Sequence, residues 1–119
     1  MAYVGWLLSK NDRIKLLNMI ETEYPDVLAH HVTYKMGNHP LPPEVTAEIV
    51  GIADDDGVQA LVVSIDGFTN RWDNSTYHIT WSINRALGKK PVDSNKVIKE
   101  YGWTSIEPIK IKLIPTLFK

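Results

Sequence analysis

Two short stretches of this chain repeat one pattern: His31-Val32-Thr33-Tyr34 and His78-Ile79-Thr80-Trp81. Each consists of a histidine, a β-branched apolar residue, a threonine and an aromatic residue, a composition that favours a β-strand. Side chains alternate between the two faces of a strand, so the histidine and the threonine of one stretch share a face. The pattern therefore predicts two strands, each presenting an imidazole and a hydroxyl on one side and apolar side chains on the other.

The same alternation assigns every residue of the two strands to a face. On the first strand, expected from Val27 to Met36, the polar face comprises Ala29, His31, Thr33 and Lys35, and the other face comprises Leu28, His30, Val32, Tyr34 and Met36. On the second, expected from Tyr77 to Ile83, the polar face comprises His78, Thr80 and Ser82, and the other face comprises Tyr77, Ile79, Trp81 and Ile83. His30 thus falls on the apolar side, as a core or edge histidine, although a register slip of one residue would exchange it with His31.

Apolar runs around the two stretches predict further strands and a helix. The strands are expected at Tyr3–Leu8, Thr46–Ala53, Val58–Ile65 and Ile109–Ile114, with Pro115 ending the last one. The helix is expected to begin at a cap within Ser9–Asn11 and to stop at Pro25, because Ile14, Leu17 and Ile20 recur at helical spacing. Among the aromatic residues, Tyr3, Trp6, Tyr34 and Trp81 are expected in the core.

A second, shorter helix is expected between a cap at Asp93 or Ser94 and a terminating Gly102. Tyr101 and Trp103, at its end, either close over a groove or complete the core. Asp54-Asp55-Asp56-Gly57 predicts a hairpin turn, since Asp-Gly supplies the positive φ angles that such a turn needs. Three carboxylates could instead bind a divalent cation, but no second acidic set accompanies them, so the turn is the preferred interpretation.

The resulting order is β-α-β-β-β-β-α-β, which predicts one α+β domain over residues 1–119. The chain contains no cysteine, which excludes disulfides, thiolate zinc sites and cysteine nucleophiles and suits the cytoplasm. Its net charge is −1 and no block of basic residues is present, which argues against binding to duplex DNA. The apolar stretch Tyr3–Leu8 is too short for a signal-peptide core or a membrane span.

If the two predicted strands lie side by side, His31 and His78 converge on one groove together with Thr33 and Thr80. A neutral imidazole can take a proton from an attacking hydroxyl, and a protonated imidazole can supply one to a leaving oxygen. The threonine hydroxyls can donate to the non-bridging oxygens of a phosphate. This set of groups suits cleavage of a phosphodiester without a metal ion or any other cofactor.

Three further residues are candidates for substrate binding. Trp72 can stack on a base and Arg71 can meet a phosphate, and both belong to the polar loop Gly67–Thr76 just before the second stretch. A tryptophan that anchors the loop beside a solvated arginine explains the same residues equally well. Lys35 shares the predicted face of His31 and Thr33 and adds positive charge there. His39, in the proline-rich loop Asn38–Pro43, is interpreted as a solvated loop residue.

The stretches His31–Gly37 and Tyr77–Ile83 resemble the paired His-x-Thr/Ser motifs of the 2H phosphoesterase superfamily, and the likeness extends over nearly the whole chain. That superfamily includes LigT-like RNA enzymes, cyclic phosphodiesterases and phage nucleases that destroy cyclic-nucleotide defence signals. The closest resemblance is to the compact Swiss-Army-Knife 2H domains associated with RNA repair.

The resemblance implies a small bilobal fold, with antiparallel sheets flanked by two helices and an active-site groove between the two His-x-Thr strands. It makes His31 and His78 catalytic and Thr33 and Thr80 phosphate-binding. The expected substrate is a nucleotide phosphodiester: a 2′,3′-cyclic phosphate, an RNA end or a cyclic oligonucleotide signal. The expected setting is the cytoplasm, or the host cytoplasm for a phage-encoded protein.

Two other functions compete with the enzyme. One is a non-catalytic RNA- or nucleotide-binding α+β module, in which aromatic side chains of the sheet recognise the ligand. The other is a degenerate relative that binds another protein, against which the hydroxyl retained in both motifs argues. Turnover that survives EDTA and depends on both His31 and His78 separates the enzyme from the two alternatives.

Overall fold

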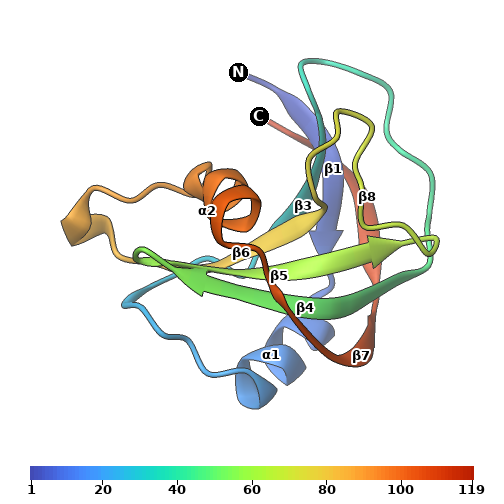
Figure 1. Ribbon diagram of the computed structural model, residues 1–119. Helices are drawn as coiled ribbons and strands as arrows, with labels where there is room; N and C mark the ends of the chain where they lie inside the picture. The colour runs from blue at the N-terminus through green and yellow to red at the C-terminus, as the bar shows by residue number, and fades with distance from the viewer.

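The two strands that carry the repeated pattern, β3 (His31–Met36) and β6 (His78–Ile83), are antiparallel neighbours in one sheet. The computed structural model describes residues 1–119 as two α-helices and a curled sheet of eight strands (Figure 1). The other strands are β1 (Tyr3–Leu8), β2 (Asp26–Val27), β4 (Ala47–Asp55), β5 (Val58–Ile65), β7 (Thr104–Ile111) and β8 (Leu113–Phe118). The helices are α1 (Lys10–Met19) and α2 (Asp93–Tyr101), and a 3-10 turn at Arg85–Leu87 precedes α2. The α+β class expected from the sequence is confirmed.

The sheet curls because its two outermost strands are consecutive in the chain. Its order is β7-β4-β5-β6-β3-β1-β8, with every pairing antiparallel and β2 added to the end of β6. Only Lys112 separates β7 from β8, although they lie at opposite ends of this order. Figure 1 shows β7 running from α2 across β4 to a corner below it, where the chain turns and rises beside β1 as β8. The sheet is therefore drawn almost into a closed ring.

Two hydrophobic clusters occupy the two faces of the sheet. The larger one contains Leu16 of α1 together with Trp6 and Trp81, which confirms the predicted core position of both tryptophans. The smaller one contains Val97 and Ile98 of α2, packed on β5. Each helix thus covers a different face (Figure 1). Neither has the length and apolar character needed to cross a lipid bilayer.

Helix α1 begins as predicted and ends earlier. Ser9 is its N-cap, and its hydroxyl accepts a hydrogen bond from the backbone N–H of Asp12 at 3.2 Å. The helix ends at Met19, six residues before the predicted stop at Pro25 (25 minus 19). Its buried residue is Leu16, whereas Ile14 is exposed, so the predicted apolar face is wrong at that position.

The predicted turn between β4 and β5 is confirmed. Asp56 and Gly57 both have positive φ angles, 52° and 77°, which is the geometry of a two-residue hairpin of the type favoured by Asp-Gly. Asp54 accepts a hydrogen bond from the hydroxyl of Tyr24 at 2.8 Å. Asp56 forms an ion pair with Lys89 at 3.0 Å. Two of the three acidic residues of this turn therefore have local partners, and no group of three potential metal ligands is found in the chain.

The first predicted strand, Val27–Met36, is interrupted. Val27 belongs to β2, His31 begins β3, and Ala29 between them has a left-handed backbone, with φ at 51°. The break resets the alternation of faces, so the assignments on its N-terminal side are wrong. Ala29 is buried in the larger cluster, and His30 is exposed instead of lying on the apolar face.

The second predicted strand contains a bulge that moves Ser82 to the opposite face. Thr80 pairs with Ala60 and Ser82 pairs with Gln59, although the two partners are neighbours in β5. Neighbours in a strand point to opposite faces, so Ser82 cannot share the face of Thr80. It is fully buried and donates a hydrogen bond to the side-chain oxygen of Gln59 at 2.6 Å.

Pro115 does not end the last strand, as the sequence predicts, but lies inside β8 opposite Trp6. Strand β8 pairs with β1 on one side only, and a proline on an edge strand removes no ladder hydrogen bond when its nitrogen faces outward. The predicted strand Ile109–Ile114 is accordingly two strands, β7 and β8, with Lys112 between them.

Candidate functional site

A cavity of about 850 Å³ opens where β3 and β6 diverge. Its lining includes all four histidines of the chain, His30, His31, His39 and His78. It also includes the two motif threonines, Thr33 and Thr80, and the three residues predicted to bind substrate, Lys35, Arg71 and Trp72. The structure thus brings every predicted site residue to one cavity.

The two motifs meet at their central residues. Val32 pairs with Ile79, and this is the one residue pair that joins β3 and β6 directly. Both side chains are fully buried, so the histidine and threonine on either side of each project toward the other face. In an antiparallel pair centred on Val32 and Ile79, the His31 end of β3 lies toward the Thr80 end of β6. Each histidine therefore has the threonine of the other motif, as well as its own, within the same site.

His78 is held in one tautomer by the backbone. Its Nδ1 lies 2.8 Å from the carbonyl oxygen of Thr76 and must donate its hydrogen there. The neutral ring therefore has an unprotonated Nε2, the atom that can accept a proton. Burial lowers the pKa of His78. The hydrogen bond to Thr76 raises this pKa in part, and the positive charge of Arg71 lowers it again.

His31 lies between a hydroxyl and a second histidine. Its Nε2 is 3.1 Å from the hydroxyl of Thr33, and its Nδ1 is 2.9 Å from the Nδ1 of His30. Burial, followed by the charges of His30 and His78, lowers the pKa of His31 to about 4. His30 therefore contacts His31 directly, although the predicted alternation of faces placed it on the apolar side of the strand.

Aromatic side chains from the two ends of the chain form one wall beside His31. The ring centroids of Phe118 and Tyr3 lie 4.8 Å and 5.4 Å from that of His31, and the two rings stack on each other at 4.9 Å. Tyr3 is half-buried and lines the cavity, so its predicted place in the core is wrong. No sequence signal links Phe118 to the first motif, because the two are brought together by the pairing of β8 with β1.

The hydroxyl of Thr80 is tied to the start of α2. It lies 2.8 Å from the hydroxyl of Ser94 and donates toward the carbonyl oxygen of Pro91 at 3.2 Å. Ser94 is fully buried. The sequence marks Ser94 only as a possible helix cap, but the N-cap position belongs to Val92 and Ser94 instead anchors α2 to the second motif.

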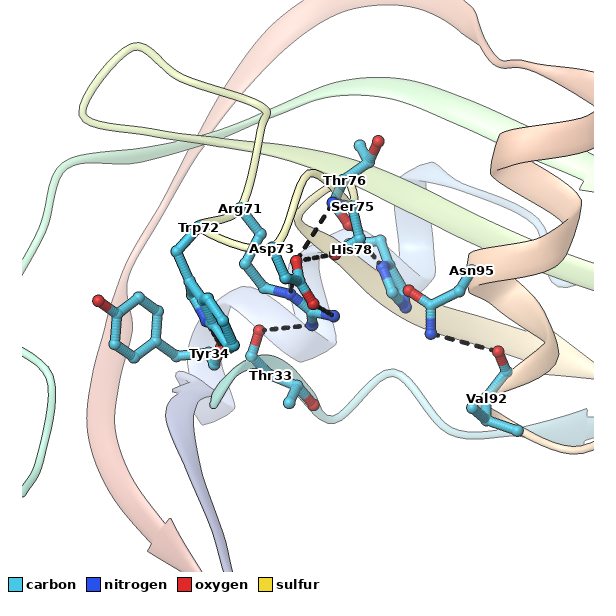
Figure 2. Close-up of polar contacts among 10 residues, drawn as sticks. All are labelled: Thr33, Tyr34, Arg71, Trp72, Asp73, Ser75, Thr76, His78, Val92 and Asn95. Atoms are coloured by element: carbon cyan, nitrogen blue, oxygen red, sulfur yellow. Dashed lines mark hydrogen bonds and ion pairs between the residues drawn. The ribbon is translucent and has the colours of Figure 1, made fainter. Parts of the chain in front are cut away.

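The loop between β5 and β6 is fastened to β3 by Arg71 and Trp72 (Figure 2). Arg71 donates to the carbonyl oxygen of Thr33 at 3.2 Å, and the indole N–H of Trp72 donates to that of Tyr34 at 2.7 Å. The Trp72 side chain is otherwise 57% exposed, and the ammonium of Lys35 lies 5.0 Å from the centre of its ring. Lys35 and Trp72 therefore form a cationic and aromatic rim at the cavity mouth.

Arg71 is already paired within the protein. Its guanidinium binds both carboxylate oxygens of Asp73, with Nε···Oδ1 at 3.0 Å and Nη2···Oδ2 at 2.9 Å. Its side chain is 12% exposed. Asp73 is the one acidic residue of the cavity lining, and this pairing neutralises it, so the remaining groups of the lining favour an anion.

Asn95 of α2 is a cavity residue that the sequence does not reveal. Its amide nitrogen donates to the carbonyl oxygen of Val92 at 3.3 Å, while its side-chain oxygen is buried and has no hydrogen-bond partner. Figure 2 shows this amide beside the ring of His78. Tyr101 and Trp103 are absent from the cavity lining; Trp103 instead packs against Gly51, with Trp103 Cε3 2.1 Å from where a Cβ on that glycine would lie.

The chain has no match among models of known protein families, and none among curated proteins or solved structures. The function is therefore argued from the geometry of the cavity.

Proposed function

We propose that this protein is a metal-independent phosphodiesterase of the 2H type, which cleaves a nucleotide phosphodiester by acid–base catalysis with His31 and His78. The observation that carries the proposal is the gathering of both motif histidines and both motif threonines around one cavity. A cavity of about 850 Å³ lies near the upper end of the range of roughly 300–1,000 Å³ for small-molecule sites. Substrates with that size and charge include 2′,3′-cyclic phosphates at RNA ends and cyclic oligonucleotides.

His78 is suited to be the general base. Its Nδ1–H is committed to Thr76, so the neutral ring offers Nε2 as the proton acceptor. The lowered pKa of His78 keeps the ring neutral near pH 7. A 2′-hydroxyl or a water molecule bound at Nε2 would lose its proton to this ring as it attacks phosphorus.

His31 then serves as the general acid. Alone, its lowered pKa of about 4 leaves it mostly neutral at pH 7. A bound phosphodiester carries a negative charge, and an opposite charge in contact with an imidazole raises its pKa. Binding of the substrate would therefore protonate His31. The imidazolium then donates this proton to the leaving oxygen.

The hydroxyls and the rim supply the remaining contacts. The hydroxyls of Thr33 and Thr80 can rotate from His31, Pro91 and Ser94 to donate to the non-bridging oxygens, where charge builds up in the transition state. Lys35 adds a cation, and the exposed face of Trp72 can stack on a base.

The two-lobed fold of this class is part of the proposal. Strands β8, β1 and β3 would form one lobe, and β6, β5, β4 and β7 the other. The single pair of Val32 with Ile79 supports this division, since every other adjacent pair of strands along this order shares a longer register.

The test is an assay of 2′,3′-cyclic nucleotides, short RNAs ending in a 2′,3′-cyclic phosphate, and cyclic dinucleotides, each in the presence of EDTA. We expect turnover of at least one of them, with phosphomonoester or linear products. His31→Ala and His78→Ala should each lower kcat by about 10²–10⁴-fold, the usual contribution of a general acid or base.

His39→Ala is the matched control, because His39 lines the same cavity but is bonded to the carbonyl oxygen of Met36 in its own loop. It should retain most of the activity. Circular dichroism verifies that each variant is folded. Turnover that requires a divalent cation would refute the proposal, and binding without turnover would favour the nucleotide-binding module.

A further inference from the structure

We infer that Arg71 and Asp73 form a positioning pair that holds the two motif strands at their working separation and orients the ring of His78. Its consequence for catalysis rests on the proposed function, whereas its consequence for the His78 ring does not. The sequence suggests a different role for Arg71, as a ligand of the substrate phosphate, and the two roles predict opposite results.

The contacts of Arg71 leave little of it for a ligand. All three of its nitrogens donate to protein oxygens: Nε and Nη2 to the carboxylate of Asp73, and Nη1 to the carbonyl of Thr33. The side chain is 12% exposed, and a two-bond fork between a guanidinium and a carboxylate has a fixed relative geometry. Arg71 is therefore held rigidly in contact with the backbone of the first motif.

Asp73 extends the same network toward the second motif. Its Oδ1 accepts hydrogen bonds from the hydroxyl of Ser75 at 2.6 Å and from the backbone N–H of Ser75 at 3.2 Å. The next residue, Thr76, offers the carbonyl oxygen that binds Nδ1 of His78. Figure 2 shows this path of contacts, which runs from Thr33 through Arg71 and Asp73 to Ser75.

The position of the pair in the sheet explains why β3 needs these contacts from the loop. Past the pair Val32–Ile79, β3 and β6 form no further ladder pair, and Arg71 and Trp72 donate to the carbonyls of Thr33 and Tyr34. Arg71 and Trp72 satisfy these carbonyls in place of a neighbouring strand. The loop thus fills the gap that opens the cavity and sets its width.

Three variants separate positioning from phosphate binding. Arg71→Met removes the guanidinium and its hydrogen bonds to Thr33 and Asp73. Arg71→Lys keeps the positive charge without the two-bond contact to the carboxylate. Asp73→Asn keeps Arg71 but breaks the ion pair and frees the guanidinium. A positioning pair predicts that all three lower kcat by about 10–100-fold with little change in KM, because a displacement near 1 Å in a site can lower the rate about 10²-fold. A phosphate ligand predicts that Arg71→Lys retains activity, that Arg71→Met raises KM, and that Asp73→Asn lowers KM.

A second readout does not depend on activity. Side-chain ¹⁵N NMR of His78 should show one tautomer, protonated at Nδ1, in the native protein and a mixture of tautomers in all three variants. Lys99→Met is the control, since it removes a cation from the exposed surface of α2 outside the cavity lining, and it should change neither readout.

The two proposals can fail separately. Loss of the single tautomer in a protein that turns over no phosphodiester supports the positioning pair and refutes the enzyme. An unchanged His78 tautomer in folded Arg71→Met and Asp73→Asn overturns the positioning pair whatever the activity. Ser75→Ala, which removes one bond to Asp73 and leaves the ion pair, replaces any variant that fails to fold, and it too should perturb the His78 ring.

Discussion

At the scale of single residues, the two motif histidines are both partly buried but have different hydrogen-bond partners. Burial lowers the pKa of both rings. His78 donates its Nδ1–H to a backbone carbonyl, whereas the Nδ1 of His31 lies 2.9 Å from the Nδ1 of His30. The protonation of His31 is therefore the more sensitive of the two to whatever enters the cavity.

We predict that His31 titrates near its depressed pKa of about 4 in the free protein and at a higher pKa when inorganic phosphate is added. The anion stabilises the imidazolium by direct charge attraction. NMR titration of the ring protons, with and without phosphate, measures the change. A His31 pKa that phosphate leaves unchanged would contradict the proposed acid.

The same depressed pKa makes folding sensitive to acid. Between an unfolded pKa of about 6.5 and the folded value of about 4, the unfolded chain binds a proton at His31 that the folded protein does not. The free energy of unfolding should therefore be greatest above pH 6.5 and fall as the pH drops toward 4. In His31→Gln this component of the fall should disappear, as urea unfolding at several pH values can show.

At the scale of elements, the position of β3 in the sheet depends on its close approach to β1. A Cβ added at Gly5 would lie 2.2 Å from the carbonyl oxygen of Val32, and Gly5 pairs with Thr33 at a bulge. Only a residue without a side chain fits between these backbones. The first motif is thus placed by a glycine on the neighbouring strand.

Gly5→Ala should destabilise the protein by about 1–3 kcal/mol, the usual penalty of overpacking, and should shift the NMR signals of His31 and Thr33. Urea unfolding and chemical-shift mapping measure the two effects. Gly67→Ala is the matched control, because no atom lies within 4 Å of the added methyl group there, although its φ of +88° carries some strain. Equal effects of the two substitutions on the motif signals would argue against the close approach as the cause.

The element scale also shows what the sequence could predict. Strict alternation correctly placed His31 with Thr33 and His78 with Thr80 on the cavity side, because neither bulge falls between the histidine and the threonine of a motif. It failed for His30, which follows the left-handed Ala29, and for Ser82, which follows a bulge. It also failed for Met36, which lies beyond the bulge in β3, lines the cavity and is 56% exposed. Breaks and bulges leave no trace in hydrophobic periodicity, since they depend on which strand pairs with which.

At the scale of the whole molecule, the curled sheet is held at the corner between β7 and β8. The backbone N–H of Lys112 donates to the carboxylate of Asp12 at 2.6 Å, and its carbonyl accepts a hydrogen bond from the N–H of Ser9 at 3.0 Å. Both partners belong to the start of α1. The sequence does not reveal this corner, because its alternating pattern predicts one continuous strand over Ile109–Ile114, with Lys112 inside it.

Asp12→Ala should lower the free energy of unfolding by about 1.5–3 kcal/mol, the range for a hydrogen bond to a charged group, and should speed hydrogen exchange in β8. Asp12→Asn retains an acceptor and should recover part of the loss, which separates the hydrogen bond from the charge at the helix start. Asp55→Ala, at the exposed last position of β4, is the control. Unchanged exchange in β8 would show that the corner is held by other contacts.

The pairing of Tyr3 with Phe118 places the first and last strands side by side, and Figure 1 shows both chain ends emerging together. A short flexible linker could therefore join them, and the polypeptide could be reopened at Asp56-Gly57 as a circular permutant without breaking a strand. In such a permutant, the aromatic wall beside His31 would lie in the middle of the polypeptide.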